Sequence, residues 1–207
     1  MDQKILLIAT TNPGKIREIQ SLLSHLPIQL LTLIDLEKQI NIFEDGNSYL
    51  ENALKKGQAY SALSGYITLA DDSGLEVDLL NGKPGIHSAR FSPKPYATDA
   101  DRRAYLLHLL FNFPRPWYAR FVCNVVICFP NGEYRSFEGV CNGEIIPEER
   151  GKNGFGYDPI FLIPEINLTM AELSMEQKNR LSHRARAIQA ALPFLSTLLG
   201  TNKAQCD

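Results

Sequence analysis

Cysteine is scarce in this sequence, and no two cysteines have the spacing of a zinc or redox motif. The four cysteines, Cys123, Cys128, Cys141 and Cys206, form no C-x-x-C pair, and no histidine stands at metal-ligand spacing from them. We therefore expect reduced thiols in the core or on the surface. A strand would place Cys123 and Cys128 on opposite faces, because an odd number of positions separates them.

Long apolar runs and a surplus of one charge are also absent. The apolar run near the amino end is too short for a signal peptide or a membrane span, so a cytoplasmic location is expected. A formal net charge of −2 gives no general affinity for nucleic acid or anionic lipid. Any phosphate binding must therefore come from a local pocket.

The order of the predicted elements indicates an α/β fold with a mixed, twisted sheet. The 207 residues, of which 44% are apolar, suit one domain over residues 1–207, built as two lobes around a central cleft. The amino-terminal part reads as strands and helices, including a helix from residue 98 with Leu106, Leu107, Leu110 and Phe111 on its core face. Residues 120–129 and 134–141 form the clearest predicted hairpin, which makes part of the sheet antiparallel.

The first polar cluster, residues 10–15, lies between a predicted strand and the start of a predicted helix. Asn12 is a good N-cap, Pro13 is favoured at the first helical position, and an amphipathic helix follows. A helix amino end can bind phosphate, although the Walker A pattern is absent. Plain capping with a solvated Lys15 remains the alternative from these residues alone.

The second cluster follows an apolar strand at residues 66–70. Asp71, Asp72, Ser73 and Gly74 read as a turn at the carboxyl end of that strand. Such residues are ordinary in turns, but ligands of open α/β sheets also bind at this edge. Spacing cannot choose between the two aspartates, because adjacent strand residues face opposite ways.

Charged residues flank the helix predicted from Ser48 to about Leu63. Ser48 and Glu51 form a predicted capping box, and Lys56 shares a helix face with Asn52. Glu44, just before the helix, either favours its dipole or reaches a metal. Farther along, Arg90 stands between apolar residues and could reach a phosphate.

The third cluster is a glycine-rich loop at residues 151–159, followed by two helices. Phe155 or Tyr157 could stack on a planar ring. Ser174 caps a short helix that carries Lys178, and Ser182 caps a second helix whose first turn holds His183 and Arg184. Basic residues are unfavourable at a helix amino end, and a bound anion or a base with carbonyl acceptors would relieve this conflict.

Taken in order, these motifs resemble the inosine/xanthosine triphosphate pyrophosphatase family over nearly the whole chain, from residue 4 to about 199. The motifs are residues 10–15 (TTNPGK), Glu44 with 51–53 (ENA), 70–75 (ADDSGL), 84–90 (PGIHSAR), 154–161 (GFGYDPIF), 171–173 (AEL) and 182–184 (SHR). Thr11 departs from a frequent glycine, and Lys83 and His87 replace commoner small and aromatic residues. Thr11 leaves the detail of the phosphate site open.

The resemblance implies that ITP, dITP and XTP are hydrolysed to monophosphate and pyrophosphate with Mg²⁺, by a two-lobed α/β fold that is usually a homodimer. It implies that Asp72 is the general base and that Glu44 and Asp72 form the metal site. The implied substrate-binding residues are Thr10, Thr11, Asn12, Pro13, Gly14, Lys15, Lys56, Ser73, Arg90, Phe155, Gly156, Tyr157, Asp158, Lys178, His183 and Arg184.

The chemistry of such a reaction suits these residue types. A triphosphate carries about four negative charges and needs lysines, helix N–H groups and a divalent cation held by hard oxygens. Arg184 donating to O6 would reject adenine, whereas no residue is identified that rejects guanine. The alternatives are a pyrophosphatase of modified pyrimidine triphosphates and a nucleotide-binding regulator without turnover. Glu44 and Asp72 argue against the regulator, since carboxylates weaken triphosphate binding unless a metal lies between.

Overall fold

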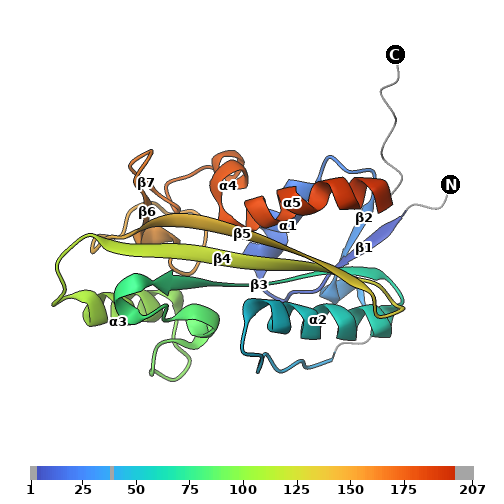
Figure 1. Cartoon of the computed structure of the whole chain (residues 1–207), viewed down its shortest axis with the longest axis horizontal. Coiled ribbons are helices and arrows are strands. Elements are labelled where there is room, and N and C mark those ends of the chain that lie inside the picture. Colours follow the sequence, from blue (N-terminus) through green and yellow to red (C-terminus); the bar gives the residue numbers. More distant parts are fainter. Residues whose placement is uncertain (1–3, 38–39, 199–207) are drawn as a thin grey trace, which may run out of the picture.

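The computed structural model describes residues 4–37 and 40–198, which build one mixed sheet in the order β2-β1-β3-β4-β5-β6-β7 (Figure 1). β1 pairs in parallel with β2 and β3, and the remaining pairs are antiparallel. The predicted mixed α/β sheet is therefore confirmed. The strands are β1 Ile5–Ile8, β2 Gln29–Thr32, β3 Ile67–Val77, β4 Trp117–Cys128, β5 Tyr134–Ile145, β6 Phe161–Ile163 and β7 Leu168–Thr169.

Helices cover both faces of the sheet. The helices are α1 Pro13–Leu23, α2 Tyr49–Ser64, α3 Asp99–Leu110, α4 Met175–Leu181 and α5 His183–Leu198, with 3₁₀ turns at Leu33–Asp35, Asp78–Leu80, Gly85–Arg90 and Asp158–Ile160. In Figure 1, α1 and α5 lie on one side of the strands and α2 on the other, while α3 lies toward the opposite end of the sheet. Within the described ranges, no helix is long and apolar enough to cross a bilayer.

The core follows the alternation of the strands. Leu6 and Ile8 of β1 pack in the cluster with α1 and α5, whereas Leu7 and Ala9 pack in the cluster with α2. The apolar run of β1 is therefore buried on both faces, as a central strand requires. The chain passes from β2 back across β1 to β3, so the carboxyl end of β1 is a topological switch point, where open α/β sheets bind ligands.

The turn predicted at residues 71–74 is wrong. These residues lie inside β3, in unbroken register with β4 from Thr68 opposite Cys128 to Val77 opposite Ala119. These residues form a strand despite their turn propensity, because pairing with β4 satisfies the backbone hydrogen bonds and because ion pairs neutralise the buried Asp71. The acidic pair therefore stands in a long strand that continues past the end of β1.

Two smaller predictions also need correction. Ser48 caps α2 by accepting from the N–H of Glu51, but the Glu51 carboxylate accepts from Asn47 N–H and not from Ser48. Phe111 is 78% exposed and not in the core, because α3 ends at Leu110 and the helical periodicity stops there.

The described cysteines are free and buried, as expected for reduced thiols. Cys123 belongs to the cluster with α1 and α5, and Cys128 belongs to the cluster with α2, so the prediction of opposite faces is confirmed. Cys206 lies outside the described residues.

Candidate active site

A cavity of about 300 Å³ opens beside the carboxyl end of β1 and collects residues from all three polar clusters. It is lined by the predicted site residues Thr10, Thr11, Asn12, Lys15, Glu44, Lys56, Asp72, Ser73, Arg90, Phe155, Gly156, Tyr157, Asp158, Lys178, His183 and Arg184. Pro13 and Gly14 do not line it. Segments that are far apart in the sequence therefore meet at the switch point.

The first wall is the loop before α1. Asn12 accepts from the N–H groups of Gly14 at 2.8 Å and Lys15 at 3.2 Å, and Thr10 Oγ1 accepts from Asn12 N–H at 3.2 Å. The predicted N-cap is thus confirmed. Gly14 lies under Phe155: a Cβ at this position would be 2.4 Å from Phe155 Cδ1. Glycine is needed here for the close approach of that ring.

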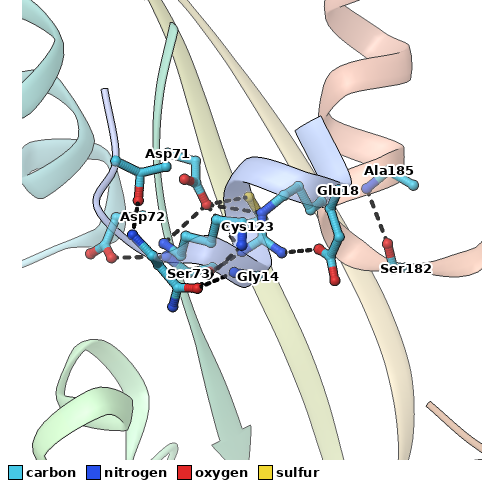
Figure 2. Close-up of polar contacts among 12 residues, drawn as sticks. Gly14, Glu18, Asp71, Asp72, Ser73, Cys123, Ser182 and Ala185 are labelled. Carbon is cyan, nitrogen blue, oxygen red and sulfur yellow. Dashed lines mark hydrogen bonds and ion pairs between the residues drawn. The ribbon is translucent and has the colours of Figure 1, made fainter. Parts of the chain in front are cut away.

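Asp71 and Asp72 point to opposite faces of β3. Asp71 is fully buried on the side of α1 and α5, with Lys15 Nζ at 3.0 Å and Arg184 Nε at 3.1 Å from its Oδ2 (Figure 2). Burial disfavours its charged form, but Lys15, Arg184 and Lys56 outweigh burial and hold the pKa of Asp71 below its ordinary value. Asp71 is therefore a fixed anion that does not line the cavity.

Asp72 faces α2 and lines the cavity. Its Oδ2 accepts from Asn52 Nδ2 at 3.1 Å, and its Oδ1 accepts from Ser73 N–H at 2.9 Å. Burial raises the pKa of Asp72 above its ordinary value, although Lys15 and Lys56 oppose the shift. A carboxylate with a raised pKa in a cavity is suited to accept a proton.

Lys56 links the Glu44 carboxylate to the backbone of β3 next to Asp72. Its Nζ donates to Glu44 Oε1 at 2.6 Å and to the Asp71 carbonyl oxygen at 2.7 Å. Burial lowers the pKa of Lys56, but Asp71, Asp72 and Glu44 together raise it, so the ammonium stays charged. Arg90 completes this wall by donating to the Glu44 carbonyl at 3.2 Å.

The donor set fits a magnesium ion that is shared with a phosphate ligand. Among the described residues, no group of three or more His, Cys, Asp or Glu side chains could hold a metal. Glu44 and Asp72 both line the cavity, and Mg²⁺ commonly takes one or two carboxylates together with waters and substrate phosphates. The residues therefore fit a substrate-shared metal and do not form a protein cage.

A buried network of alternating charges runs behind the other end of the cavity. Lys178 Nζ lies 2.6 Å from Asp158 Oδ2 and 2.7 Å from Glu18 Oε1. Arg184 donates to Glu18 and to Asp71, which binds Lys15. The order Lys15, Asp71, Arg184, Glu18, Lys178, Asp158 thus joins the two ends of the cavity, and Figure 2 shows the part of this series between Asp71 and Glu18.

The sequence suggested that a bound anion or a base with carbonyl acceptors would relieve the basic residues at the start of α5, but the protein's own carboxylates already do so. Glu18 and Asp71 already neutralise Arg184. Burial, with Arg184 and Lys178 nearby, lowers the pKa of His183 well below its ordinary value, so its ring is neutral at pH 7. The ring stacks on Phe121, with centroids 4.7 Å apart.

The start of α5 lies directly on β5 because β5 has a glycine there. A Cβ at Gly139 would be 2.1 Å from the carbonyl oxygen of His183 and 2.4 Å from the nitrogen of Ala187. Ser182 caps the helix as predicted, accepting from Ala185 N–H at 3.2 Å. Close packing on β5 therefore sets the distance between the sheet and the helix turn that carries His183 and Arg184.

Comparison with known proteins decides the family. Residues 6–194 match the model of the Ham1 family. The chain belongs to the Ham1 family. This confirms the resemblance that the ordered motifs indicated.

Relatives of this Ham1 chain match it over nearly its full length. A protein of Desulforamulus reducens named dITP/XTP pyrophosphatase is 44% identical, covering 93% of this chain and 96% of that protein. One of Geobacter sulfurreducens with the same name is 46% identical, covering 88% and 92%. The solved structure of the Staphylococcus aureus Ham1 protein is 38% identical, with a TM-score of 0.82 over 94% of this chain and all of that chain.

The Ham1 fold also gives α3 a place at the site, which its sequence did not suggest. Asp99 Oδ2 accepts from Gly156 N–H at 2.7 Å, and Arg103 Nη1 donates to the Gly156 carbonyl at 2.9 Å. Asp99 and Arg102 also line the cavity. The amino-terminal part of α3 therefore holds the peptide beside Phe155, a contact between residues more than fifty positions apart.

Glu18 is a second residue whose role in this Ham1 site was missed. It is 3% exposed on α1, next to the core residue Ile19, and a buried acid must be paired. In the sequence, Glu18 is only an acidic residue next to the apolar positions of α1. Such a residue is normally predicted to be exposed to solvent. Its partners Lys178 and Arg184 lie far away in the sequence, so only the fold identifies them.

Proposed function

We propose that the protein hydrolyses non-standard purine nucleoside triphosphates, such as ITP, dITP and XTP, to the monophosphate and pyrophosphate. The observation that carries the proposal is Asp72, a cavity carboxylate near the cations Lys15 and Lys56, whose oxygens are oriented by Asn52 Nδ2 and Ser73 N–H. Relatives at 44% and 46% identity that are named dITP/XTP pyrophosphatases support it.

The triphosphate end of the cavity has cations but no surplus of them. Lys15, Lys56 and Arg90 face Asp71, Asp72 and Glu44, so the protein charges cancel there. A ligand with about four negative charges therefore calls for a divalent cation. Glu44 and Asp72 would hold Mg²⁺, which when bound supplies the positive charge that offsets the charge developing on pyrophosphate.

Asp72 is the proposed general base. Both of its oxygens accept only one hydrogen bond from the protein among the described residues, so each keeps a lone pair for a water. In the proposed step the water loses a proton to Asp72 while its oxygen attacks the α-phosphorus, and the bond to the leaving pyrophosphate breaks. Asp71 is unsuited to this role because its charge is already committed to Lys15 and Arg184.

The base end suits a purine. The Phe155 ring, with Lys178 Nζ 5.2 Å and Arg184 Cζ 5.7 Å from its centroid, offers a surface for stacking. Arg184 donates to Asp71, Glu18 and Ser73, and the five N–H groups of a guanidinium leave a donor for O6 of the base. Adenine presents a donor at that position, so we expect ITP to be hydrolysed much faster than ATP.

We further propose that residues 1–207 act as one catalytic unit, in the cytoplasm and as a homodimer. The exposed aromatic residues Phe111 and Tyr118, at 78% and 60%, support a partner surface near the end of α3 and the start of β4. Light scattering after size-exclusion chromatography measures the mass in solution. A monomer at micromolar concentration would contradict the homodimer.

The test of the function is a panel of triphosphates with Mg²⁺, in which pyrophosphate and orthophosphate are measured separately. We expect pyrophosphate from ITP, dITP and XTP and little from ATP. Release of orthophosphate, or a preference for modified pyrimidine triphosphates, would contradict the proposal. Binding of ITP without turnover would favour the regulator instead.

A further inference from the structure

Asn52 is a wholly buried amide of α2 that uses both of its ends beside the site. Its Nδ2 donates to Asp72 Oδ2 at 3.1 Å, and its Oδ1 accepts from Gly46 N–H at 2.8 Å. Asn52 does not line the cavity, so it touches no ligand there. A buried amide is costly unless it is paired, and here each half is paired to a different part of the site.

The Gly46 bond holds the loop that carries Glu44. A Cβ on Gly46 would be 2.7 Å from Asn52 Oδ1 and 2.8 Å from Glu51 Cβ, so the loop passes against α2 more closely than any other residue type allows. Glu44 lies two positions earlier, and its carboxylate is bound by Lys56, one helical turn after Asn52. The amide therefore joins the Glu44 loop to β3.

We propose that Asn52 is a positioning residue, which holds Asp72 and the Glu44 loop at a fixed separation. This rests on the proposed function, in which these two carboxylates serve the same phosphate. Asn52 fixes one oxygen of Asp72 through its amide and the loop backbone through its carbonyl oxygen. Because a misplacement of about 1 Å can cost about 100-fold in rate, loss of either bond lowers kcat.

The two halves of the amide can be separated by substitution. Asn52→Asp keeps an oxygen for Gly46 N–H, but it replaces the donor to Asp72 with a second carboxyl group and so also adds a like charge beside Asp72. Asn52→Ala removes both bonds and adds no charge. Hydrogen–deuterium exchange of residues 44–47, measured without metal or nucleotide, reports on the Gly46 bond. Steady-state kcat and KM for ITP report on the placement of Asp72.

Ser61 is the matched control. It is a wholly buried polar side chain of the same helix α2, and its Oγ lies within hydrogen-bond distance of the carbonyl oxygens of Tyr66, at 2.8 Å, and Cys128, at 3.2 Å. Ser61→Ala therefore removes buried polar contacts of α2 at a position that does not line the cavity. Thermal melts followed by circular dichroism compare the stability of all variants.

We expect Asn52→Ala to lower kcat about 100-fold, to change KM less than about threefold and to speed exchange at residues 44–47. Asn52→Asp should lower kcat similarly with exchange close to wild type, and Ser61→Ala should keep both kcat and exchange within about threefold of wild type. If Asn52→Ala fails to fold, Asn52→Asp carries the test.

The proposal is overturned if Asn52→Asp keeps its kcat within about threefold of wild type, or if Ser61→Ala loses as much activity as the Asn52 variants. It is also overturned if exchange at residues 44–47 is unchanged in folded Asn52→Ala. A wild-type protein that releases no pyrophosphate would instead refute the proposed function, and the exchange measurement would still decide whether Asn52 holds the loop.

Discussion

The two ends of the cavity handle charge in different ways. At the phosphate end, the Glu44 side chain is 36% exposed and binds Lys56 at the cavity wall, while Arg90 is exposed. At the base end, Lys178, Glu18, Asp158 and Arg184 have side chains that are at most 5% exposed, and each is paired with an opposite charge. Glu44 and Arg90 at the phosphate end can therefore exchange partners, whereas the base end and the buried Lys15–Asp71 pair are fixed before a ligand binds.

This difference separates binding from stability. Exposed ion pairs contribute little to folding and can be broken for a ligand at small cost. A buried pair costs several kcal/mol to break, because one charge is left uncompensated in the interior. Substitutions at the phosphate end should thus affect turnover, and those in the buried network should affect stability.

The largest effect is expected at the phosphate end, from Asp72→Asn. An amide cannot take a proton from water, so kcat should fall about 10³-fold while ITP still binds. Isothermal titration with a non-hydrolysable analogue measures that binding. Because burial disfavours the charged Asp72, the melting temperature should not fall, and a drop in stability equal to the loss of activity would break the comparison.

The next effect is expected in the buried network, from Glu18→Gln. Burial opposes the charged Glu18, but Arg184 and Lys178 outweigh burial and lower its pKa below the ordinary 4.5. The stabilisation is therefore full above about pH 4.5 and is lost as the pH falls through the lower folded pKa. We expect a loss of about 3 kcal/mol in unfolding free energy at pH 7, and a smaller loss in acid.

Denaturant melts at several pH values measure this effect. Glu176→Gln is the control, because it breaks the exposed pair with Arg180, where the side chains are 76% and 72% exposed. The free energy of unfolding of the Glu176→Gln variant should differ little from that of the wild type at any pH. A Glu18→Gln loss that stays constant down to pH 3 would show that the carboxylate charge is not responsible.

A smaller effect is expected where the two ends touch, from Gly14→Ala. The new methyl group would overlap the Phe155 ring and displace it, so KM for ITP should rise about tenfold with little change in kcat. Alanine suits the first turn of a helix, so stability should hold. A double-mutant cycle with Phe155→Ala checks the cause: in that background Gly14→Ala should have no further effect.

The smallest effect is expected from Asp99→Ala, which releases Gly156 N–H and also removes the ion pair of Asp99 with Arg102. Loss of the hydrogen bond to Gly156, about 1 kcal/mol, should raise KM for ITP about fivefold. Asp101→Ala is the control, because Asp101 caps the same helix turn through Thr98 but does not touch Gly156. Equal changes in KM for both variants would assign the effect to helix stability.

Local signals predicted the elements that depend on neighbouring residues. Asn12 and Pro13 start α1, Ser174 and Ser182 start α4 and α5, and the hairpin of β4 and β5 appears where apolar alternation placed it. Each of these depends on bonds within a few positions of the chain.

The misread turn shows what local signals cannot supply. Asp71 is tolerated in a strand because Arg184, 113 positions away, and Lys15 neutralise it. No pattern within a short window contains that partner. The same holds for the ion pairs of Glu18 and for the hydrogen bond from Gly156 N–H to Asp99. These contacts form only when the fold brings α1, α3 and the glycine-rich loop together.

The choice between Asp71 and Asp72 illustrates the boundary. Strand alternation predicts that they face opposite ways, and β3 confirms this. Which of the two faces α2 depends on the register of β3 with β1 and β4, a long-range property. The role of Asp72 as the base therefore stays a prediction for the Asp72→Asn experiment.

Gly139 gives the sheet a part in substrate choice that no pocket residue reveals. The helix turn with His183 and Arg184 lies on the strand surface only because this position lacks a side chain. A single added carbon at this position would push that turn away from the strand and shift the donors that face the base. Under the proposed function, a substitution at Gly139 of β5 can therefore change the selectivity among nucleobases, although Gly139 does not line the cavity.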